Sequence, residues 1–231
     1  MTPISEPAKE RLLHLMRILE KSGGAPITSG EIEGLTGWSS NTIRKDISCL
    51  GGDDGGNAVG SSVGYTAETL VPAIKKALGL DRRRRFCVVG LGRLGSAYLN
   101  AQAYGPNAAE SGTSGLNLEE FELTAGFDTN VNRVEILSSP APLYPAYKMG
   151  EVISRFSIEI ALLCVPPEAA QQAAEKLAAA GIRGILNFAP VVLTLPPEIP
   201  VRNVYVVDEL RTLAIKMENN PNKPCNQKEI L

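Results

Sequence analysis

The spacing of apolar residues changes once along this chain, near residue 80. Before that point, apolar side chains recur every three or four residues in short segments, which is typical of amphipathic helices. After it, short apolar runs alternate with helix-forming segments, which predicts parallel strands joined by right-handed crossovers. The sequence therefore predicts an α/β protein with a helical domain over residues 1–80 and a parallel-sheet domain over residues 81–204.

Three helices of the first domain follow from apolar spacing and capping residues. Glu6–Lys21 and Glu68–Leu78 are amphipathic. Between them, Thr28 and Glu31 have the spacing of a capping box, which predicts a short helix that ends within Gly34–Gly37. The apolar faces of the two longer helices are expected to form a core from Leu12, Leu15, Met16, Leu19, Leu70, Ile74 and Leu78.

A further helix is predicted from an N-cap at Ser39–Ser40 to about Leu50. Ile43, Ile47 and Leu50 repeat at helical spacing and are expected to face the core. The opposite face is polar and basic, with Asn41, Arg44, Lys45 and Ser48. Two short capped helices, the second with such a face, are the outline of a helix-turn-helix. The glycine-rich segment Gly51–Gly64 follows in the position of a wing.

The second domain alternates predicted strands and helices. Strands are expected at residues 86–89, 121–128, 158–165, 184–188 and 201–206, with a helix at 167–180. Gly105–Glu119 is rich in loop-forming residues and predicts an inserted loop. A last helix is expected at Asp208–Met217, within a terminal segment 205–218, and residues 219–231 are expected to be a flexible tail.

The most informative motif is the sequence G-x-G-x-x-G directly after the first predicted strand. Gly90 would allow a tight turn, Gly92 the close approach of a pyrophosphate, and Gly95 close packing of helix on strand. Free N–H groups at the start of that helix would bind the phosphates. A dinucleotide site is therefore expected at Gly90, Leu91, Gly92, Arg93, Leu94 and Gly95. A glycine-rich turn with a purely structural role is the alternative.

Asp128 ends the second predicted strand, where a carboxylate would accept hydrogen bonds from an adenosine ribose. Its charge would repel a 2′-phosphate and so favours NAD over NADP. The alternative is an acidic residue that faces water at a strand end. Ligands of parallel sheets bind at the carboxyl ends of the strands, so pocket-lining residues are also expected among Cys164, Val165, Pro166, Asn187, Phe188, Ala189 and Pro190. The prolines there are equally consistent with simple strand termination.

Composition narrows the class of protein further. The net charge is −2, no apolar run is long enough to span a bilayer, and no signal peptide is recognisable, so a cytoplasmic protein is expected. The arginine run at residues 82–85 is interpreted as a solvated linker, with nucleic-acid contact as the alternative. The four cysteines lack the spacing of a metal site or a disulfide framework. Cys87 and Cys164 are expected to be inert in strands, and Cys49 is interpreted as buried, with a reactive thiol as the alternative.

A catalytic acid–base group is missing from the pattern. Nicotinamide dehydrogenases usually place one beside the reacting carbon, most often a histidine. The only histidine, His14, lies in the first predicted helix, and little chain follows the nucleotide-binding core to form a substrate pocket. We therefore expect no catalytic residues and a cofactor that is sensed rather than consumed. A small NAD-dependent oxidoreductase that uses a lysine or tyrosine stays open as an alternative.

These motifs together resemble the Rex family of redox-sensing transcriptional repressors. The resemblance spans roughly residues 7–217 and includes the segments 44–46, 63–65, 79–80, 89–95, 126–128, 158–161 and 181–190. It implies a homodimer in which a winged-helix domain binds double-stranded operator DNA and a Rossmann domain senses the NADH/NAD⁺ ratio. NADH would release the DNA, and the last helix would be exchanged between subunits.

The resemblance also implies roles for particular residues. Residues 90–95 and Asp128 would hold the pyrophosphate and the adenosine ribose, and residues 165–166 and 187–190 would lie near the nicotinamide. Arg44 and Lys45 are the leading candidates for DNA contacts in the major groove. They would be supported by Ser40, Asn41 and Ser48.

Two features depart from the family pattern. The expected wing contains Asp53 and Asp54 and no basic residue, and residues 1–80 hold eight basic and nine acidic residues, a net charge of −1. In the family, an aspartate near the last helix changes partner between an arginine and a tyrosine. Arg17 matches the arginine, whereas Tyr205 and Ala101 occupy the other two positions. An NAD(H)-binding relative that has lost DNA binding therefore remains an alternative.

Overall fold

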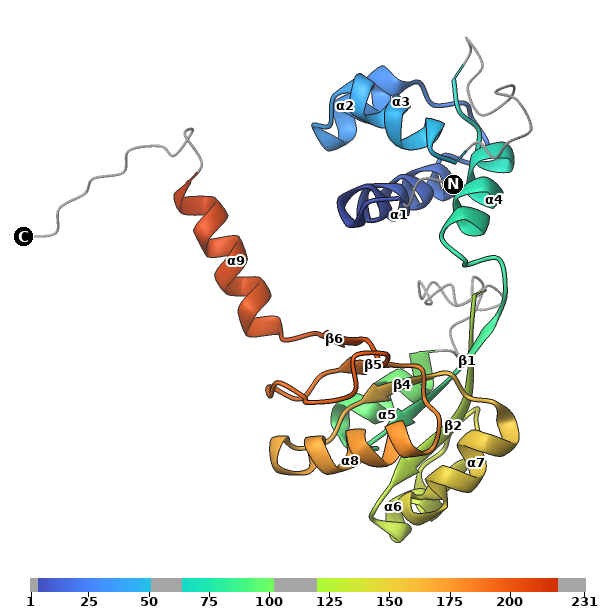
Figure 1. Cartoon of the computed structure of the whole chain (residues 1–231), viewed down its shortest axis with the longest axis vertical. Coiled ribbons are helices and arrows are strands. Elements are labelled where there is room, and N and C mark those ends of the chain that lie inside the picture. Colours follow the sequence, from blue (N-terminus) through green and yellow to red (C-terminus); the bar gives the residue numbers. More distant parts are fainter. Residues whose placement is uncertain (1–3, 51–63, 102–119, 220–231) are drawn as a thin grey trace, which may run out of the picture. The chain divides into compact units, whose positions relative to one another are not determined.

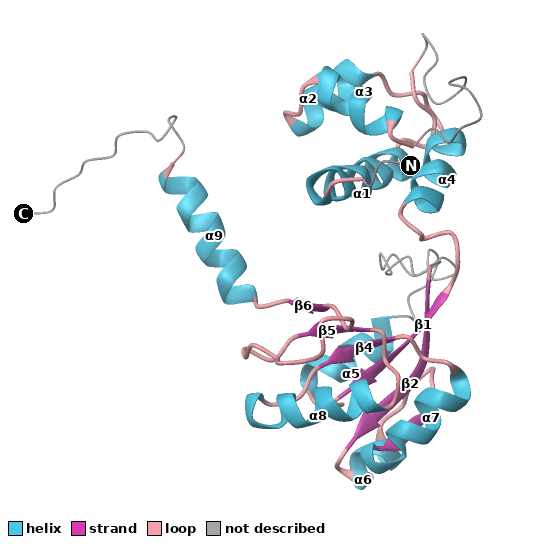
Figure 2. Ribbon diagram, viewed as in Figure 1, coloured by secondary structure: helices cyan, strands magenta, loops and turns pink. Residues whose placement is uncertain are grey.

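The structure, a computed structural model, describes residues 4–50, 64–101 and 120–219. The chain divides into two compact units, Met1–Arg83 and Arg84–Leu231. Figures 1 and 2 show helices in the first unit and a sheet with helices in the second. The predicted inserted loop at 105–119, nearly all of the predicted wing and the tail from residue 220 lie outside the described residues.

The described part of the first unit contains the four predicted helices. They are α1 (Glu6–Lys21), α2 (Ser29–Thr36), α3 (Ser40–Ser48) and α4 (Ala67–Ala77). Apolar side chains from all four meet in one core, which includes Leu12, Leu19, Ile32, Ile43, Ile47, Leu70 and Ile74. Burying each such side chain contributes roughly 1.5–3 kcal/mol, so the apolar faces read from the sequence are what hold this unit together.

Side chains fix the ends of α2 and α3. Thr28 accepts a hydrogen bond from the Glu31 N–H at 3.2 Å, and the Glu31 carboxylate accepts one from the Thr28 N–H at 2.7 Å. The predicted capping box is thus confirmed. Gly37 ends α2 in the left-handed conformation, with a φ of 74°. The Ser39 hydroxyl caps the start of α3, which ends at Ser48, slightly before its predicted end.

A partly buried ion pair joins α3 to α1. The Asp46 carboxylate accepts hydrogen bonds from Arg11 Nε at 2.6 Å and from Arg11 Nη2 at 2.9 Å. The hydrogen bond and the charge of Asp46 raise the pKa of the Arg11 guanidinium, although burial acts in the opposite direction. Two parallel bonds of this kind set orientation as well as distance, so the pair aligns α3 on α1.

The described part of the second unit contains a six-stranded parallel sheet in the order β3-β2-β1-β4-β5-β6, which confirms the predicted α/β class. The strands are β1 (Arg84–Val89), β2 (Phe121–Asp128), β3 (Leu143–Pro145), β4 (Ile160–Leu163), β5 (Gly184–Asn187) and β6 (Val201–Asn203). Val89 of β1 is level with both Phe127 of β2 and Leu163 of β4. The strand order reverses between β1 and β4, and ligands of parallel sheets bind at such a point.

Helices cover both faces of this sheet. They are α5 (Arg93–Ala101), α6 (Val131–Ile136), α7 (Met149–Phe156) and α8 (Pro167–Ala179), with a 3₁₀ turn at Ala146–Lys148. Figure 1 shows α7 and α8 in front of the sheet and α5 behind it. Right-handed crossovers produce this arrangement, because the chain moves outward from β1 in one direction through β2 and β3 and later in the other through β4.

Several boundaries differ from those predicted. β1 begins at Arg84, so the last two arginines of the arginine run belong to a strand and not to a linker. β4 and β6 are shorter than their apolar runs. The pattern did not predict β3, α6 or α7. β3 has three residues in a segment interrupted by prolines, and α6 has no buried residue to create a periodic signal.

The last helix, α9 (Val206–Glu218), has no buried residue. Its exposed apolar side chains include Val206, Leu210, Leu213 and Met217. These positions are separated by three or four residues and therefore share one face of the helix.

The cysteines differ in their surroundings. Cys87 is buried in β1, and burial raises the pKa of its thiol. Cys164 is half-buried directly after β4, and burial raises its pKa to about 12. Both therefore stay protonated and inert at neutral pH, as expected. The interpretation of Cys49 as buried is wrong. It is exposed, and it is the C-cap residue that directly follows the last residue of α3.

Candidate functional site

The turn after β1 depends on two glycines. Gly90 has a φ of 90°, and a side chain there would place its Cβ 2.6 Å from the carbonyl oxygen of Cys164. A Cβ on Gly95 would overlap the carbonyl oxygen of Gly90. Gly92, in contrast, has no atom within 4 Å of a Cβ position, so the space beside it is open. Gly90 and Gly95 thus fit the tight turn and the close helix packing predicted for them, and Gly92 faces free space.

Asp128 ends β2 with a side chain that is only 5% exposed. Its carboxylate accepts hydrogen bonds from the Leu91 N–H and the Asn130 N–H, both at 2.7 Å, and from Arg133 Nη1 at 2.9 Å. Burial raises the pKa of this carboxyl, but the two backbone amides and Arg133 outweigh it, so the pKa lies below its ordinary value. Asp128 is ionised and turned inward, and the alternative of a water-facing carboxylate is wrong.

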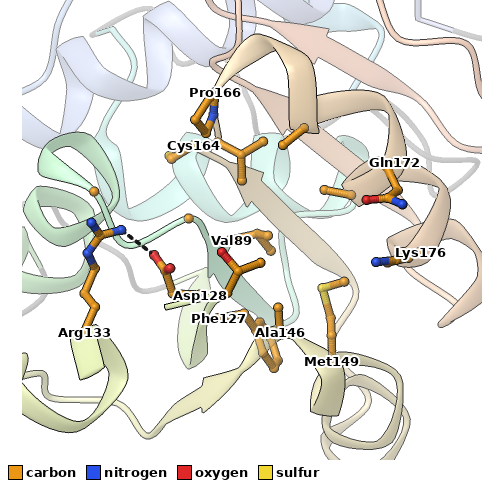
Figure 3. Close-up of a pocket in the computed structure, with 16 residues that line it drawn as sticks. Val89, Phe127, Asp128, Arg133, Ala146, Met149, Cys164, Pro166, Gln172 and Lys176 are labelled. Carbon is orange, nitrogen blue, oxygen red and sulfur yellow. Dashed lines mark hydrogen bonds and ion pairs between the residues drawn. The ribbon is translucent and has the colours of Figure 1, made fainter. Parts of the chain in front are cut away.

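A cavity of about 490 Å³ opens at the carboxyl ends of β1, β2 and β4. Figure 3 shows Asp128 and Arg133 on one side of it, with Gln172 and Lys176 of α8 on the other. Its size lies within the range typical of cofactor sites. The lining residues are Val89, Gly90, Gly92, Phe127, Asp128, Thr129, Arg133, Ala146, Met149, Cys164, Val165, Pro166, Ala169, Gln172, Ala173 and Lys176.

The structure brings together six of the predicted cofactor residues in this cavity. They are Gly90, Gly92, Asp128, Cys164, Val165 and Pro166. Leu91 contributes its N–H to Asp128, while its side chain is buried in the core. Arg93 and Leu94 begin α5 with exposed side chains, and Gly95 packs against the turn.

The segment after β5 lies outside the lining of this cavity. The Asn187 side chain is buried and donates to the carbonyls of Ala189 and Val191 and to the Asn203 side chain, while it accepts a bond from the Ala189 N–H. Its amide is therefore satisfied by the protein and fixes the loop after β5. The Phe188 ring packs on Tyr98 of α5, with ring centroids 5.0 Å apart.

Sequence reasoning missed ten of the sixteen lining residues. Ala169, Gln172, Ala173 and Lys176 are spaced by three and four residues on α8, so helical periodicity would have identified them as one face. Ala146 and Met149 follow β3, a strand that the pattern did not predict. No sequence pattern identified Arg133 as a lining residue, although it lies only five residues after Asp128.

The predicted DNA-contacting residues lie on α3. Asn41, Arg44, Lys45 and Ser48 are exposed, and Ser40 is half-buried. The Ser40 hydroxyl and N–H both donate to the Glu33 carboxylate, and Arg44 Nη2 donates to the Ser29 hydroxyl at 3.2 Å. The bonds from Ser40, with a smaller contribution from the charge of Arg44, lower the pKa of Glu33. A carboxylate of α2 is therefore fixed at the start of α3.

The described residues give no sign of a metal site or a membrane segment. Within them, no group of three histidine, cysteine, aspartate or glutamate side chains is arranged to hold a metal ion. None of the described helices combines the length and the apolarity needed to cross a bilayer.

Known proteins match both units of the chain. Residues 81–191 match the family described as the CoA binding domain. The whole chain is 38% identical over 225 residues to the redox-sensing transcriptional repressor Rex of Thermus thermophilus, which covers 94% of this chain and 95% of the relative. It is 33% identical over 199 residues to Rex of Ligilactobacillus salivarius, which covers 86% and 85%.

Solved structures agree with these relatives. RSP, a Rex-family repressor, matches with a TM-score of 0.74 at 30% identity and covers 95% of this chain and 97% of that chain. The structure of RSP with β-NAD⁺ and operator DNA matches with a TM-score of 0.75 at 29% identity, covering 95% and 94%. RSP with β-NADH gives 0.74 at 28% identity, covering 95% and 96%.

The helical unit followed by a Rossmann-like sheet is therefore the architecture of a transcriptional repressor, and these relatives are repressors rather than enzymes. The chain belongs to the Rex family of redox-sensing transcriptional repressors, which confirms the resemblance found in the sequence.

Proposed function

We propose that this protein binds double-stranded operator DNA as a homodimer and is released when NADH binds the cavity of the sheet unit. The observation that carries the proposal is the ionised, buried Asp128 beside the glycine turn, at the point where the strand order reverses. A dinucleotide is the ligand that this combination suits best.

In the proposed complex, the adenosine ribose donates hydrogen bonds to Asp128. The pyrophosphate lies in the open space beside Gly92, at the amino end of α5, where backbone N–H groups attract negative charge. The cavity continues past Cys164, Val165 and Pro166. We place the nicotinamide on the side of residues 187–190, whose loop is held in one conformation by the Asn187 amide.

The helices α2 and α3 would form a helix-turn-helix, with α3 as the recognition helix and the segment from residue 51 as the wing. Support comes from the exposed polar face of α3, on which Arg44 and Lys45 stand beside Asn41 and Ser48. The ion pair between Arg11 and Asp46 would hold that helix at a fixed angle on α1.

The homodimer would form through α9. Its face of Val206, Leu210, Leu213 and Met217 is apolar and uncovered within the described residues. An apolar helical stripe of this kind is normally buried against another element. A second copy of the chain is the partner implied by the family, and a dimer is what a two-fold operator requires.

The two redox forms of the cofactor differ in charge at the nicotinamide. Oxidised nicotinamide is cationic and the reduced ring is neutral, so the two forms bind a closed, dry pocket with different affinity. Only such a difference can shift the balance between DNA-bound and free conformations.

The relay between cofactor and DNA must differ from that of the family, because Tyr205 and Ala101 replace two of its members. Asp208 and Tyr98 are the nearby groups that would substitute for these members, and each already has another contact. Asp208 pairs with Arg211 at 2.7 Å, and the Tyr98 ring packs on Phe188.

A fluorescence-anisotropy titration of the full chain on palindromic operator candidates tests the proposal. We expect nanomolar, salt-sensitive binding that NADH abolishes and NAD⁺ leaves intact. NADH that binds the protein without releasing a specific complex would refute the sensing mechanism. A double variant, Leu210→Asp with Leu213→Asp, should be monomeric in analytical ultracentrifugation and should lose operator binding but keep its sheet unit folded.

A second candidate function is an NAD(H)-binding protein that has lost DNA recognition. The bonds that tie Ser40 and Arg44 to α2, together with the net negative charge of residues 1–80, favour it. The same titration separates the two, since this candidate binds NADH but no DNA sequence specifically.

A further inference from the structure

One side-chain amide connects two segments to which the proposed function gives different tasks. Asn187 ends β5 and is 1% exposed. Its side chain bonds to the loop that follows β5, beside which we place the nicotinamide, and also to Asn203, the last residue of β6. The chain then runs from β6 directly into α9 (Figure 1), with Val204 and Tyr205 between them. The cofactor loop and the start of the proposed dimer helix therefore meet at a single side chain.

The role of each amide atom follows from its neighbours. The Asn187 nitrogen lies 3.1 Å from the carbonyl oxygen of Ala189 and 2.9 Å from that of Val191, and both oxygens can only accept. The Asn187 side-chain oxygen in turn accepts a bond from the Ala189 N–H at 3.0 Å. The Asn203 side chain lies 2.9 Å from the same Asn187 nitrogen, so it must present its oxygen as an acceptor.

Three acceptors compete for the two hydrogens of this amide group. An amide NH2 group has two hydrogens to donate, whereas Ala189, Val191 and Asn203 each offer it an oxygen. One hydrogen is therefore shared between two acceptors. The Ala189 oxygen also accepts from the Val191 N–H at 2.8 Å. A change in the spacing of the two loop carbonyls consequently alters how strongly the amide of Asn187 binds Asn203.

β6 buries little apolar surface that would fix its position. It lies at the edge of the described sheet and has three residues, of which Val201 is half-buried and Arg202 and Asn203 are exposed. Its register places Asn203 opposite Asn187, and the Val204 N–H donates to the Asn187 carbonyl oxygen at 2.8 Å. The bond between the two side chains therefore has a large share in setting the direction in which the chain enters α9.

The cofactor loop is anchored at both ends. At the near end, the Phe188 N–H donates to the Leu163 carbonyl oxygen at 3.0 Å. At the far end, the Gln171 side chain of α8 accepts from the Thr194 N–H at 3.0 Å and donates to the Thr194 carbonyl oxygen at 2.9 Å. A ligand that packs on this loop would therefore move the stretch between the anchors, which contains the two competing carbonyls.

We propose that Asn187 and Asn203 are positioning residues that link the nicotinamide end of the cavity to the start of α9. A reduced nicotinamide against the loop would move the two loop carbonyls, and the hydrogen given to Asn203 would change with them. The end of β6 and the first turn of α9 would respond. The inference rests on the proposed cofactor site and dimer helix, and it names the side chains that connect them. The coupling is reciprocal, so fixing α9 in a dimer would also change NADH affinity.

The test uses variants of Asn203, because its removal leaves the cofactor loop intact. In Asn203→Ala, each of the two hydrogens on the Asn187 amide keeps one loop carbonyl, so the amide stays satisfied and the protein should fold. Asn203→Asp keeps an oxygen acceptor in the same place and should behave like wild type. Arg202→Ala is the matched control, because it removes the neighbouring exposed side chain, which alternates to the other face of the strand.

Hydrogen exchange of the full chain with and without NADH, followed by mass spectrometry, measures the link directly. In wild type, Asn203→Asp and Arg202→Ala, we expect NADH to change exchange in the first turn of α9 at least about fivefold. In Asn203→Ala the change should fall below about twofold, while calorimetry should give an NADH affinity within about threefold of wild type. A residue with a merely structural role would instead lower NADH affinity or stability in every state.

Operator DNA gives a second measurement of the same coupling. The factor by which NADH weakens operator binding should fall at least about tenfold in Asn203→Ala and stay near the wild-type value in Asn203→Asp. The exchange experiment needs no DNA, so it decides the inference even for a protein that binds no operator.

The outcomes that overturn the link differ from those that overturn the cofactor site. NADH that binds wild type without changing α9 exchange would refute the link alone. The same conclusion would follow from a wild-type response in Asn203→Ala, or from a response in Asn203→Asp as weak as that expected for Asn203→Ala. Failure of NADH to bind wild type would refute the proposed cofactor site together with the link.

Discussion

The two units fix their candidate functional groups in different ways. In the sheet unit, backbone conformation and burial fix these groups. Gly90 has a φ of 90°, and the Asp128 side chain is 5% exposed and accepts hydrogen bonds from three donors. In the helical unit, Arg44 and Lys45 are exposed and depend on helix placement and surface hydrogen bonds. A site of the first kind tolerates few substitutions, whereas one of the second kind is tuned by charge.

Substitution of the glycines in the sheet unit tests whether backbone conformation fixes the site. Gly95→Ala should lower the free energy of unfolding by about 3 kcal/mol or more, because its Cβ overlaps the Gly90 carbonyl oxygen. That corresponds to a fall in Tm of roughly 6–12 °C. Gly92→Ala is the matched control for folding and should leave Tm unchanged while NADH affinity falls at least about tenfold. A wild-type Tm for Gly95→Ala, measured by calorimetry, would contradict the packing described.

A second test concerns the buried carboxylate. Asp128→Asn should destabilise the sheet unit by about 2 kcal/mol at pH 7, since three donors lose a charged acceptor. The folded-state pKa of Asp128 is lowered, so its contribution is present above the unfolded value of about 4 and is lost as the pH falls through the folded value.

The measurement is chemical denaturation of both proteins between neutral and acidic pH. The difference in stability between wild type and variant should shrink below a pH of about 4. Glu6→Gln, which removes an exposed ion pair with Lys9, is the control and should show almost no effect. A difference that stays constant down to the lowest pH would show that the charge of Asp128 does not stabilise the fold.

Asp46 is a buried charge in the described part of the helical unit, and its substitution tests that unit in the same way. Asp46→Asn should lower stability by about 1–2 kcal/mol, because the two-bond pair with Arg11 is lost from a partly buried position. NADH affinity should not change. If NADH affinity falls as well, the two units are coupled even without DNA.

A surface substitution in the helical unit should change DNA affinity only slightly. Glu33→Gln keeps an acceptor for Ser40 but removes a negative charge at the start of α3. Affinity for double-stranded DNA should rise about threefold at low salt and less at high salt. Glu68→Gln, at the start of α4, is the control. Equal affinities of wild type and Glu33→Gln at low salt would place that carboxylate away from the DNA.

The sequence predicted best those elements whose signal is local. The capping box at Thr28 and Glu31, the turn at Gly90 and the strand that ends at Asp128 all depend on neighbouring residues, and all are present. Sequence reasoning did not predict Arg133, Met149 and Lys176. They lie on helices that connect the strands, and they line the cavity. Their positions depend on how the strands are ordered, which residue spacing alone does not specify. Cys49 was misjudged because its position depends on where α3 ends.

The lining of the cavity contains no histidine, and this has a consequence for what the pocket can sense. Asp128 has a lowered pKa, and burial raises the pKa of Cys164 to about 12, so neither group changes charge near neutrality. In the proposed complex, occupancy of the cavity therefore depends on the concentration of reduced cofactor and changes little with pH near neutrality.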